Sequence, residues 1–144
     1  MTYDEIAGGA ELVRWFGQEP TFHDAEILSL HLRRKGQSSL CLHGWISTGE
    51  VGQDGYYVLD RHAIVTFTLT EVVDLKLDGF SRQNVIGGLV LRRAPDRADR
   101  YGYFSPLPQD IEVELEPCYG LDGFIRARSV SIEFKPGKPD GQDD

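Results

Sequence analysis

Cysteine, basic residues and long apolar runs are all scarce in this sequence of 144 residues, and each scarcity excludes a class of protein. The two cysteines, Cys41 and Cys118, are too few for a disulfide framework, so we expect free thiols and a cytoplasmic location. No apolar run approaches the roughly 20 residues of a membrane-spanning helix. Fifteen basic against 23 acidic residues give a net charge of −8, which disfavours nucleic acid and anionic membranes as partners and favours a basic protein.

Complete catalytic signatures are also missing. The sequence has no GxSxG nucleophile motif, and the glycine pairs at Gly8 and Gly87 lack the flanking residues of a phosphate loop. Glu112, Glu114 and Glu116 alternate along a predicted strand, which is typical of a solvated strand face and not of an acid–base site. We therefore expect a protein without enzyme activity and without a cofactor.

What is present is the composition of one globular domain, with 40% hydrophobic and 26% charged residues. We predict a single domain over residues 1–135 and a disordered acidic tail over residues 136–144. Apolar residues near a helical stripe predict a short amphipathic helix over residues 4–17, which Gly17 and Pro20 would end.

Alternating apolar and polar residues predict β-strands in the rest of the domain. Residues 28–46 form a predicted hairpin in which Leu32 faces Leu40 and Leu30 faces Leu42. Further strands are predicted in the segments 63–77, 84–92, 111–115 and 124–134, with loops at 48–57 and 94–109. Glu71 would point inward in a straight strand, so we expect a bulge near Thr70 to Asp74.

The last two strands also permit a prediction of register. A turn centred on Gly120 would place Glu112 opposite Arg128 and Glu114 opposite Arg126 as cross-strand ion pairs. Taken together, the pattern predicts an α+β fold that is mainly β, with an antiparallel meander sheet of six or seven strands and a short N-terminal helix.

Two groups of side chains are candidate metal ligands of a hydrolase. His23, Asp24 and Glu26 lie between the helix and the first strand, where a structural role in the connector is the alternative. His31, Cys41 and His43 would share one face of the hairpin in the predicted register, where they either bind zinc or only cover the sheet. Neither group has the spacing of a known metal motif, so no metal is expected.

Aromatic residues in predicted loops are candidate partner contacts. Tyr56, Tyr57, Tyr101 and Tyr103 lie in polar, glycine-containing segments. Tyrosine is enriched at the energetic centres of protein interfaces, and the alternative is that these rings close the ends of the core.

The N-terminal region carries a family resemblance. Trp15-Phe16-Gly17, followed by Pro20-Thr21-Phe22-His23-Asp24-Ala25-Glu26-Ile27, resembles the immunity protein 50 family of bacterial polymorphic toxin systems. The similarity continues through Gly79–Ile86 and Cys118–Gly123. The resemblance implies a small protein that neutralises a cognate toxin by binding it, and the matching positions Trp15, Phe22, His23, Asp24 and Glu26 are its candidate binding residues.

The leading hypothesis from sequence is thus a cytoplasmic protein-binding domain that binds a protein partner, such as a basic toxin domain. Two hypotheses of other classes stand beside it. One is a metal-dependent hydrolase that uses either ligand group, and the other is a structural domain that forms a homo-oligomer through a sheet edge.

Overall fold

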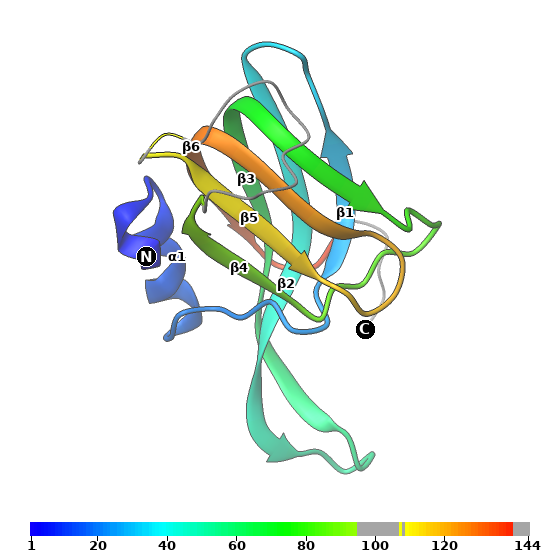
Figure 1. Cartoon of the computed structure of the whole chain (residues 1–144). Coiled ribbons are helices and arrows are strands. Elements are labelled where there is room, and N and C mark those ends of the chain that lie inside the picture. The colour runs from blue at the N-terminus through cyan, green and yellow to red at the C-terminus, as the bar shows by residue number, and fades with distance from the viewer. Residues whose placement is uncertain (95–106, 108, 140–144) are drawn as a thin grey trace.

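A computed structural model describes the protein over residues 1–94, 107 and 109–139. Its strands form one antiparallel sheet of six, in the order β1-β2-β3-β6-β5-β4 (Figure 1). The strands are β1 (Glu26–His31), β2 (Gln37–Val51), β3 (Tyr57–Asp78), β4 (Gly88–Arg93), β5 (Ile111–Glu116) and β6 (Asp122–Pro136). A 3-10 turn, η1 (Tyr3–Glu5), and a short helix, α1 (Gly9–Phe16), precede them. This arrangement confirms the predicted α+β class, mainly β.

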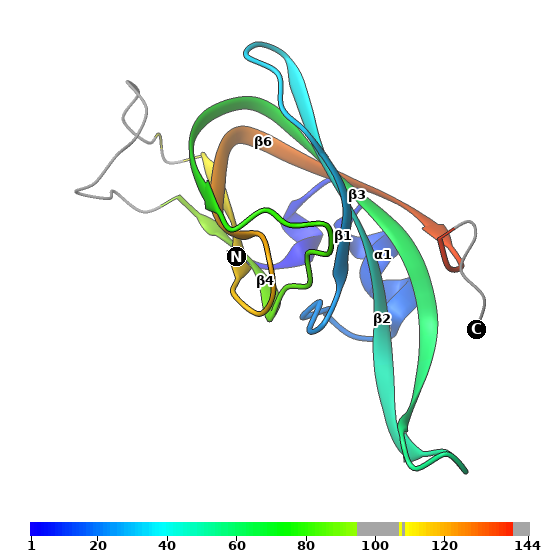
Figure 2. The ribbon, with the colours of Figure 1, turned by 90° about the vertical axis from the view of Figure 1, so that its right-hand side faces the viewer.

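The strand order departs from chain order at one point, because β3 pairs with β6 and not with β4. The chain after β3 crosses to the far side and closes the curved sheet (Figure 2). There, the amide of Ile27 donates to the carbonyl of Asn84 at 2.8 Å, and the amide of Asp24 donates to the carbonyl of Ile86 at 3.0 Å. The segment before β1 is therefore fixed to the segment before β4.

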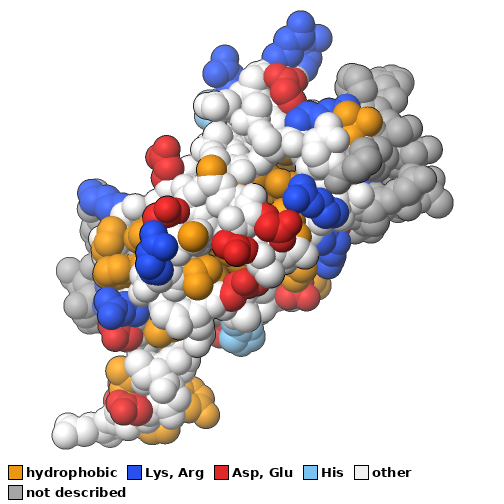
Figure 3. Space-filling view, turned by 90° about the vertical axis from the view of Figure 1, so that its left-hand side faces the viewer, with side chains coloured by type: hydrophobic (Ala, Val, Ile, Leu, Met, Phe, Trp, Pro, Cys, Tyr) orange, Lys and Arg blue, Asp and Glu red, His pale blue; other side chains and the backbone are white. Residues whose placement is uncertain are grey.

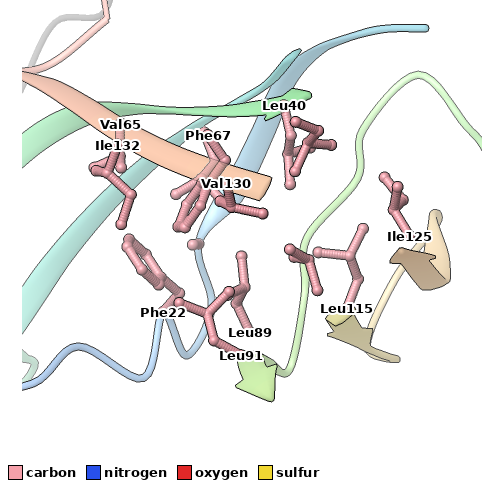
Figure 4. Close-up of a cluster of buried hydrophobic side chains, with 14 of the residues drawn as sticks. Phe22, Leu40, Val65, Phe67, Leu89, Leu91, Leu115, Ile125, Val130 and Ile132 are labelled. Atoms are coloured by element: carbon pink, nitrogen blue, oxygen red, sulfur yellow. The ribbon is translucent and has the colours of Figure 1, made fainter. Parts of the chain in front are cut away.

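The core lies inside this curved sheet. Figure 4 shows side chains from β2, β3, β4, β5 and β6 gathered in one cluster with Phe22. The inward positions alternate along each strand, as in Leu40 and Leu42 of β2 and Val65 and Phe67 of β3, all fully buried. Burial of each such side chain contributes about 1.5–3 kcal/mol to folding.

The N-terminal helix is shorter than predicted because its first turn meets the sheet. Gly8 has a φ of 86°, and a Cβ atom there would lie 1.9 Å from the carbonyl oxygen of Ile132. The amide of Ile132 in turn donates to the carbonyl of Ala7 at 2.8 Å. Glycine at this position permits a backbone contact between helix and β6. Neither described helix is long and apolar enough to cross a bilayer.

The predicted register of the first hairpin is wrong by two positions. Leu30 lies opposite Leu40, the place predicted for Leu32. The pairing shifts just after Ile27, which leaves Leu28 on the outer surface with 38% of its area exposed. A β-bulge of this kind reverses which side of the sheet the following residues face.

The register predicted for β5 and β6 is also wrong, although charged residues do pair across this part of the sheet. Glu112, and not Glu114, lies opposite Arg126. Arg128 instead pairs with Asp110, whose carboxylate lies 2.7 Å from its guanidinium. The turn between β5 and β6 is centred one residue earlier than predicted, which moves every pair by two.

Of three other predicted features, one is confirmed, one is wrong in its start and one lies mostly outside the described residues. The expected irregularity near Thr70 to Asp74 is confirmed, because Glu71 has a φ of 56° and the β3–β6 pairing shifts just after it. The predicted tail begins too early, since Pro136 still belongs to β6 and the amide of Gly137 donates to the carbonyl of His62 at 2.8 Å. Most of the predicted loop 94–109 lies outside the described residues.

Residues 48–57 are not the predicted loop. Their strands β2 and β3 continue well beyond the sheet and are joined by a short turn (Figures 1 and 2). The flanking strands stop earlier, since β1 last pairs at His43 and β6 at Ala63. Residues 46–60 therefore project as a two-stranded hairpin, which we call the arm.

Candidate functional site

A groove of about 530 Å³ lies between the base of the arm and the connector that follows α1. We call it the arm groove. Its lining residues are Gln18, Pro20, Thr21, His23 and Asp24 from the connector, and Trp45, Ile46, Ser47, Tyr57 and Leu59 from β2 and β3. The groove thus brings together two sets of residues that the sequence singled out separately, the connector motif and an arm tyrosine.

The connector wall is a tight loop in which two residues adopt left-handed backbone conformations. Phe22 has a φ of 57° and Asp24 a φ of 64°. Such conformations cost about 1–2 kcal/mol for most residues and persist only where the surroundings impose them. Here the side chain of Phe22 is buried against Phe16 and Phe67, and the amide of Ala25 donates to the carbonyl of Phe22 at 3.0 Å. Phe22 is therefore a core residue that shapes the loop and not a partner contact.

The same loop presents His23 and Asp24 to the groove. The Nδ1 atom of His23 lies 2.9 Å from the carbonyl oxygen of Gly87, so this nitrogen carries the proton and donates it. The Nε2 atom then lies 3.5 Å from a carboxylate oxygen of Asp24. Both side chains remain more than half exposed, at 72% and 55%. They are placed to contact a bound molecule.

The arm forms the other wall and is exposed over almost its whole length. Among residues 47–61, all but Gly52 are exposed. Five large apolar side chains are among the exposed ones, namely Val51, Tyr56, Tyr57, Val58 and Leu59. Figure 3 shows hydrophobic side chains gathered along this projecting part of the surface. Tyr56 and Tyr57 are both exposed, whereas Tyr101 and Tyr103 lie outside the described residues.

Trp15 and Glu26, like Phe22, do not line the groove. Trp15 supports the base of the arm from another side, since its indole nitrogen donates to the carbonyl of Arg61 at 3.2 Å and the Arg61 guanidinium lies 5.0 Å from its ring centre. Glu26 begins β1 opposite His43 and does not line the groove.

A histidine pair at the base of the arm was missed by the sequence analysis. The Nε2 atom of His43 lies 3.0 Å from the Nδ1 atom of His62, and the two rings stack at 5.2 Å. Trp45 packs against both rings. The sequence does place one histidine on each strand of the hairpin. Their side chains come into contact through a bulge after Gly44, which the sequence does not show.

The histidine pair predicts how stability depends on pH. Burial, with the nearby charges of His62 and Lys138, lowers the pKa of His43 from 6.5 to about 4. Between these values the unfolded chain binds a proton that the folded protein does not, so the free energy of unfolding should fall as the pH falls from about 6.5 to about 4.

Urea denaturation at a series of pH values measures this slope. We expect His43→Gln to flatten it, and His31→Gln, at an exposed histidine, to leave it unchanged. An identical slope in the wild type and in His43→Gln would contradict the assignment.

Neither candidate group of metal ligands is assembled among the described residues. His31 lies opposite Ser39 and Cys41 opposite Ser29, so the candidate cluster with His43 does not form. In the part of the chain that the structure describes, no three or more histidine, cysteine, aspartate or glutamate side chains are grouped so that they could hold a metal ion. Both cysteines are free thiols.

Comparison with known proteins gives no relatives: no family model, no curated protein and no solved structure matches the chain. The resemblance to the immunity protein 50 family thus stays a prediction that depends on the sequence motifs alone.

Proposed function

We propose that this chain is a protein-binding domain and that the arm and the arm groove contact its protein partner. The observation that carries the proposal is the set of five large apolar side chains exposed on the arm. Val51, Tyr57 and Leu59 share one face of the arm, because Val51 pairs with Tyr57 and alternate residues of a strand face the same way. Exposed apolar patches commonly mark interaction sites. Two of the five are tyrosines, a residue type enriched where interfaces gain most of their energy.

The construction of the arm supports the same proposal. A two-stranded hairpin is only marginally stable by itself in water. Beyond Gly44 and Ala63 the arm pairs with no described strand on either side. A partner that covers the arm would bury apolar area that the free protein leaves in water, and this burial favours association.

The charge of the arm indicates a basic partner. Residues 45–60 contain Glu50, Asp54 and Asp60 and no lysine or arginine. Complementary charge speeds association and discriminates against acidic partners. A basic toxin domain, bound and neutralised in the cytoplasm, is the partner that the family resemblance implies, and we propose it on that basis.

The arm predicts a loss of binding in a double variant. We expect Tyr56→Ser with Tyr57→Ser to weaken partner binding by about a hundredfold or more, because two interface tyrosines are truncated. Affinity capture from the native organism with mass spectrometry identifies the partner, and calorimetric titration of that partner measures the change. Tyr119→Ser is the matched control, since Tyr119 is 58% exposed but lies outside the arm.

Three further outcomes bear on the proposal. Rescue of cells from a toxic captured partner by the wild type, and not by the arm variant, would support the toxin assignment. A concentration-dependent dimer that the arm variant loses in light scattering would assign the arm to self-association instead. Equal binding of the partner by the wild type and the double variant would overturn the role of the arm.

A further inference from the structure

We infer that the arm groove holds a lysine or arginine side chain of the partner, with the carboxylate of Asp24 as its counter-ion and the rings of Trp45 and Tyr57 as its aromatic wall. This inference rests on the proposed function and specifies its chemistry. Asp24 is the residue that would recognise the partner's charge.

The charge inside the groove favours a cation. Asp24 is the one carboxylate among the lining residues, and no lysine or arginine is among them. Its loop holds the backbone of Asp24 in place, because the amide of Asp24 donates to the carbonyl of Ile86 at 3.0 Å and the neighbouring Phe22 is buried. A side chain on a backbone that is fixed before binding has less conformational freedom to lose when a cation arrives.

The wall of the groove across from that carboxylate is aromatic. Trp45 and Tyr57 both line the groove from the arm side. A cation within about 6 Å of such a ring is attracted to its face, most strongly for tryptophan. The chain itself uses this contact elsewhere, where the guanidinium of Arg61 lies 5.0 Å from the ring centre of Trp15.

The size of the groove and its apolar wall also suit such a side chain. At about 530 Å³ the groove falls within the range of roughly 300–1,000 Å³ that is usual for small-ligand sites. Ile46 and Leu59 add apolar surface to its wall. The long aliphatic part of a lysine or arginine side chain can cover such surface while its charged end reaches the carboxylate.

The two tryptophans of the chain provide a direct test by nuclear magnetic resonance. Trp45 lines the groove and Trp15 does not, so the indole signal of Trp45 reports binding and that of Trp15 is an internal reference. The probes are N-acetyl-argininamide, N-acetyl-lysinamide and the neutral analogue N-acetyl-citrullinamide. We expect a saturable shift of the Trp45 signal with at least one cationic probe, and binding of citrullinamide that is weaker by about tenfold.

Matched variants separate a local contact from the general acidity of the protein. Asp24→Asn keeps the shape of the side chain and tolerates the left-handed backbone, and we expect it to weaken the cationic probe by about threefold to fivefold. Asp78→Asn removes the same charge from an exposed carboxylate at the other end of β3, outside the arm and the arm groove, and we expect no change. Equal binding of citrullinamide, an unchanged affinity in Asp24→Asn, or no saturable shift of Trp45 would each overturn the inference.

The captured partner distinguishes the failure of this inference from the failure of the proposed function. If Asp24→Asn binds the partner as the wild type does while the arm variant does not, the cation site is wrong and the binding role of the arm stands. If the arm variant also binds normally, the proposed function itself fails.

Discussion

Replacement of Glu112 by alanine is expected to lower the free energy of unfolding by about 3–5 kcal/mol. Its side chain is fully buried and holds two arginines at once. One carboxylate oxygen accepts from the Nε atom of Arg126 at 3.1 Å, and the other accepts from Arg92 at 2.8 Å. Without Glu112, the buried guanidinium of Arg126 would lose its closest counter-charge.

Arg126 depends strongly on its contact with Glu112, because its other guanidinium nitrogens have few polar partners. Only 1% of its surface is exposed, and neither terminal nitrogen has a hydrogen-bond partner in the part of the chain that the structure describes. Asp74 supplies a second charge, but at 3.6 Å. Removal of one member of a buried ion pair is costly because the remaining charge cannot be solvated.

Chemical denaturation in urea, followed by circular dichroism, measures the loss. Glu114→Ala is the control, because Glu114 also binds Arg92, at 2.6 Å, but its side chain is 36% exposed. For this partly exposed pair we expect a loss of less than about 1 kcal/mol. Equal losses in the two variants would contradict the assignment of Arg126 as a buried charge that depends on Glu112.

This network illustrates what the sequence could and could not predict. The alternation of acidic residues with apolar ones identified β5, and the idea of acid–base pairing across β5 and β6 was sound. The partners were misassigned because the turn is held by Tyr119, whose amide and carbonyl both bond to Val85, at 2.9 and 2.8 Å. A contact between segments over 30 residues apart cannot be read from local pattern.

Burial of the network was equally hidden. Glu112 has the strand pattern of a solvent-facing residue, yet it lies between Arg92 on β4 and Arg126 on β6. Two strands must pair with β5 before this environment exists. Local alternation therefore distinguishes the two faces of a strand but does not show which face remains in water.

The candidate site was predicted in its parts but not as a whole. The connector motif, Tyr56 and Tyr57 were named from sequence as candidate contacts. The groove was not predicted, because it requires β2 and β3 to continue past the ends of their neighbours. Within the motif, exposure also could not be assigned: Phe22 is 2% exposed, whereas His23, the next residue, is largely in solvent.

This difference leads to the second large effect, an expected loss of about 3–5 kcal/mol in the free energy of unfolding for Phe22→Ala. The ring packs edge-on against Phe16 and Phe67, with ring centres 6.0 and 5.9 Å away. The sheet also approaches it closely, since a Cβ atom at Gly44 would lie 2.8 Å from the ring. Truncation would leave a cavity that these rigid neighbours cannot fill.

The same substitution should loosen the wall of the arm groove. Burial of the ring is what holds Phe22 in its left-handed backbone conformation, so alanine would release the strain along with the contact. In a variant that remains folded, amide hydrogen exchange should show lost protection at Asp24, whose amide bonds to Ile86. Exchange at Phe67, in the central strand β3, should change no more than global stability requires.

His23→Ala is the matched control because it removes the adjacent, largely exposed side chain. We expect His23→Ala to lower the free energy of unfolding by less than about 1.5 kcal/mol. This is the usual contribution of one hydrogen bond, such as that from the His23 side chain to Gly87. If Phe22→Ala proved no more destabilising than His23→Ala, Phe22 could not be the residue that fixes the loop. A large cost for Phe22→Ala alone, with lost protection at Asp24, would instead link the core directly to the geometry of the arm groove.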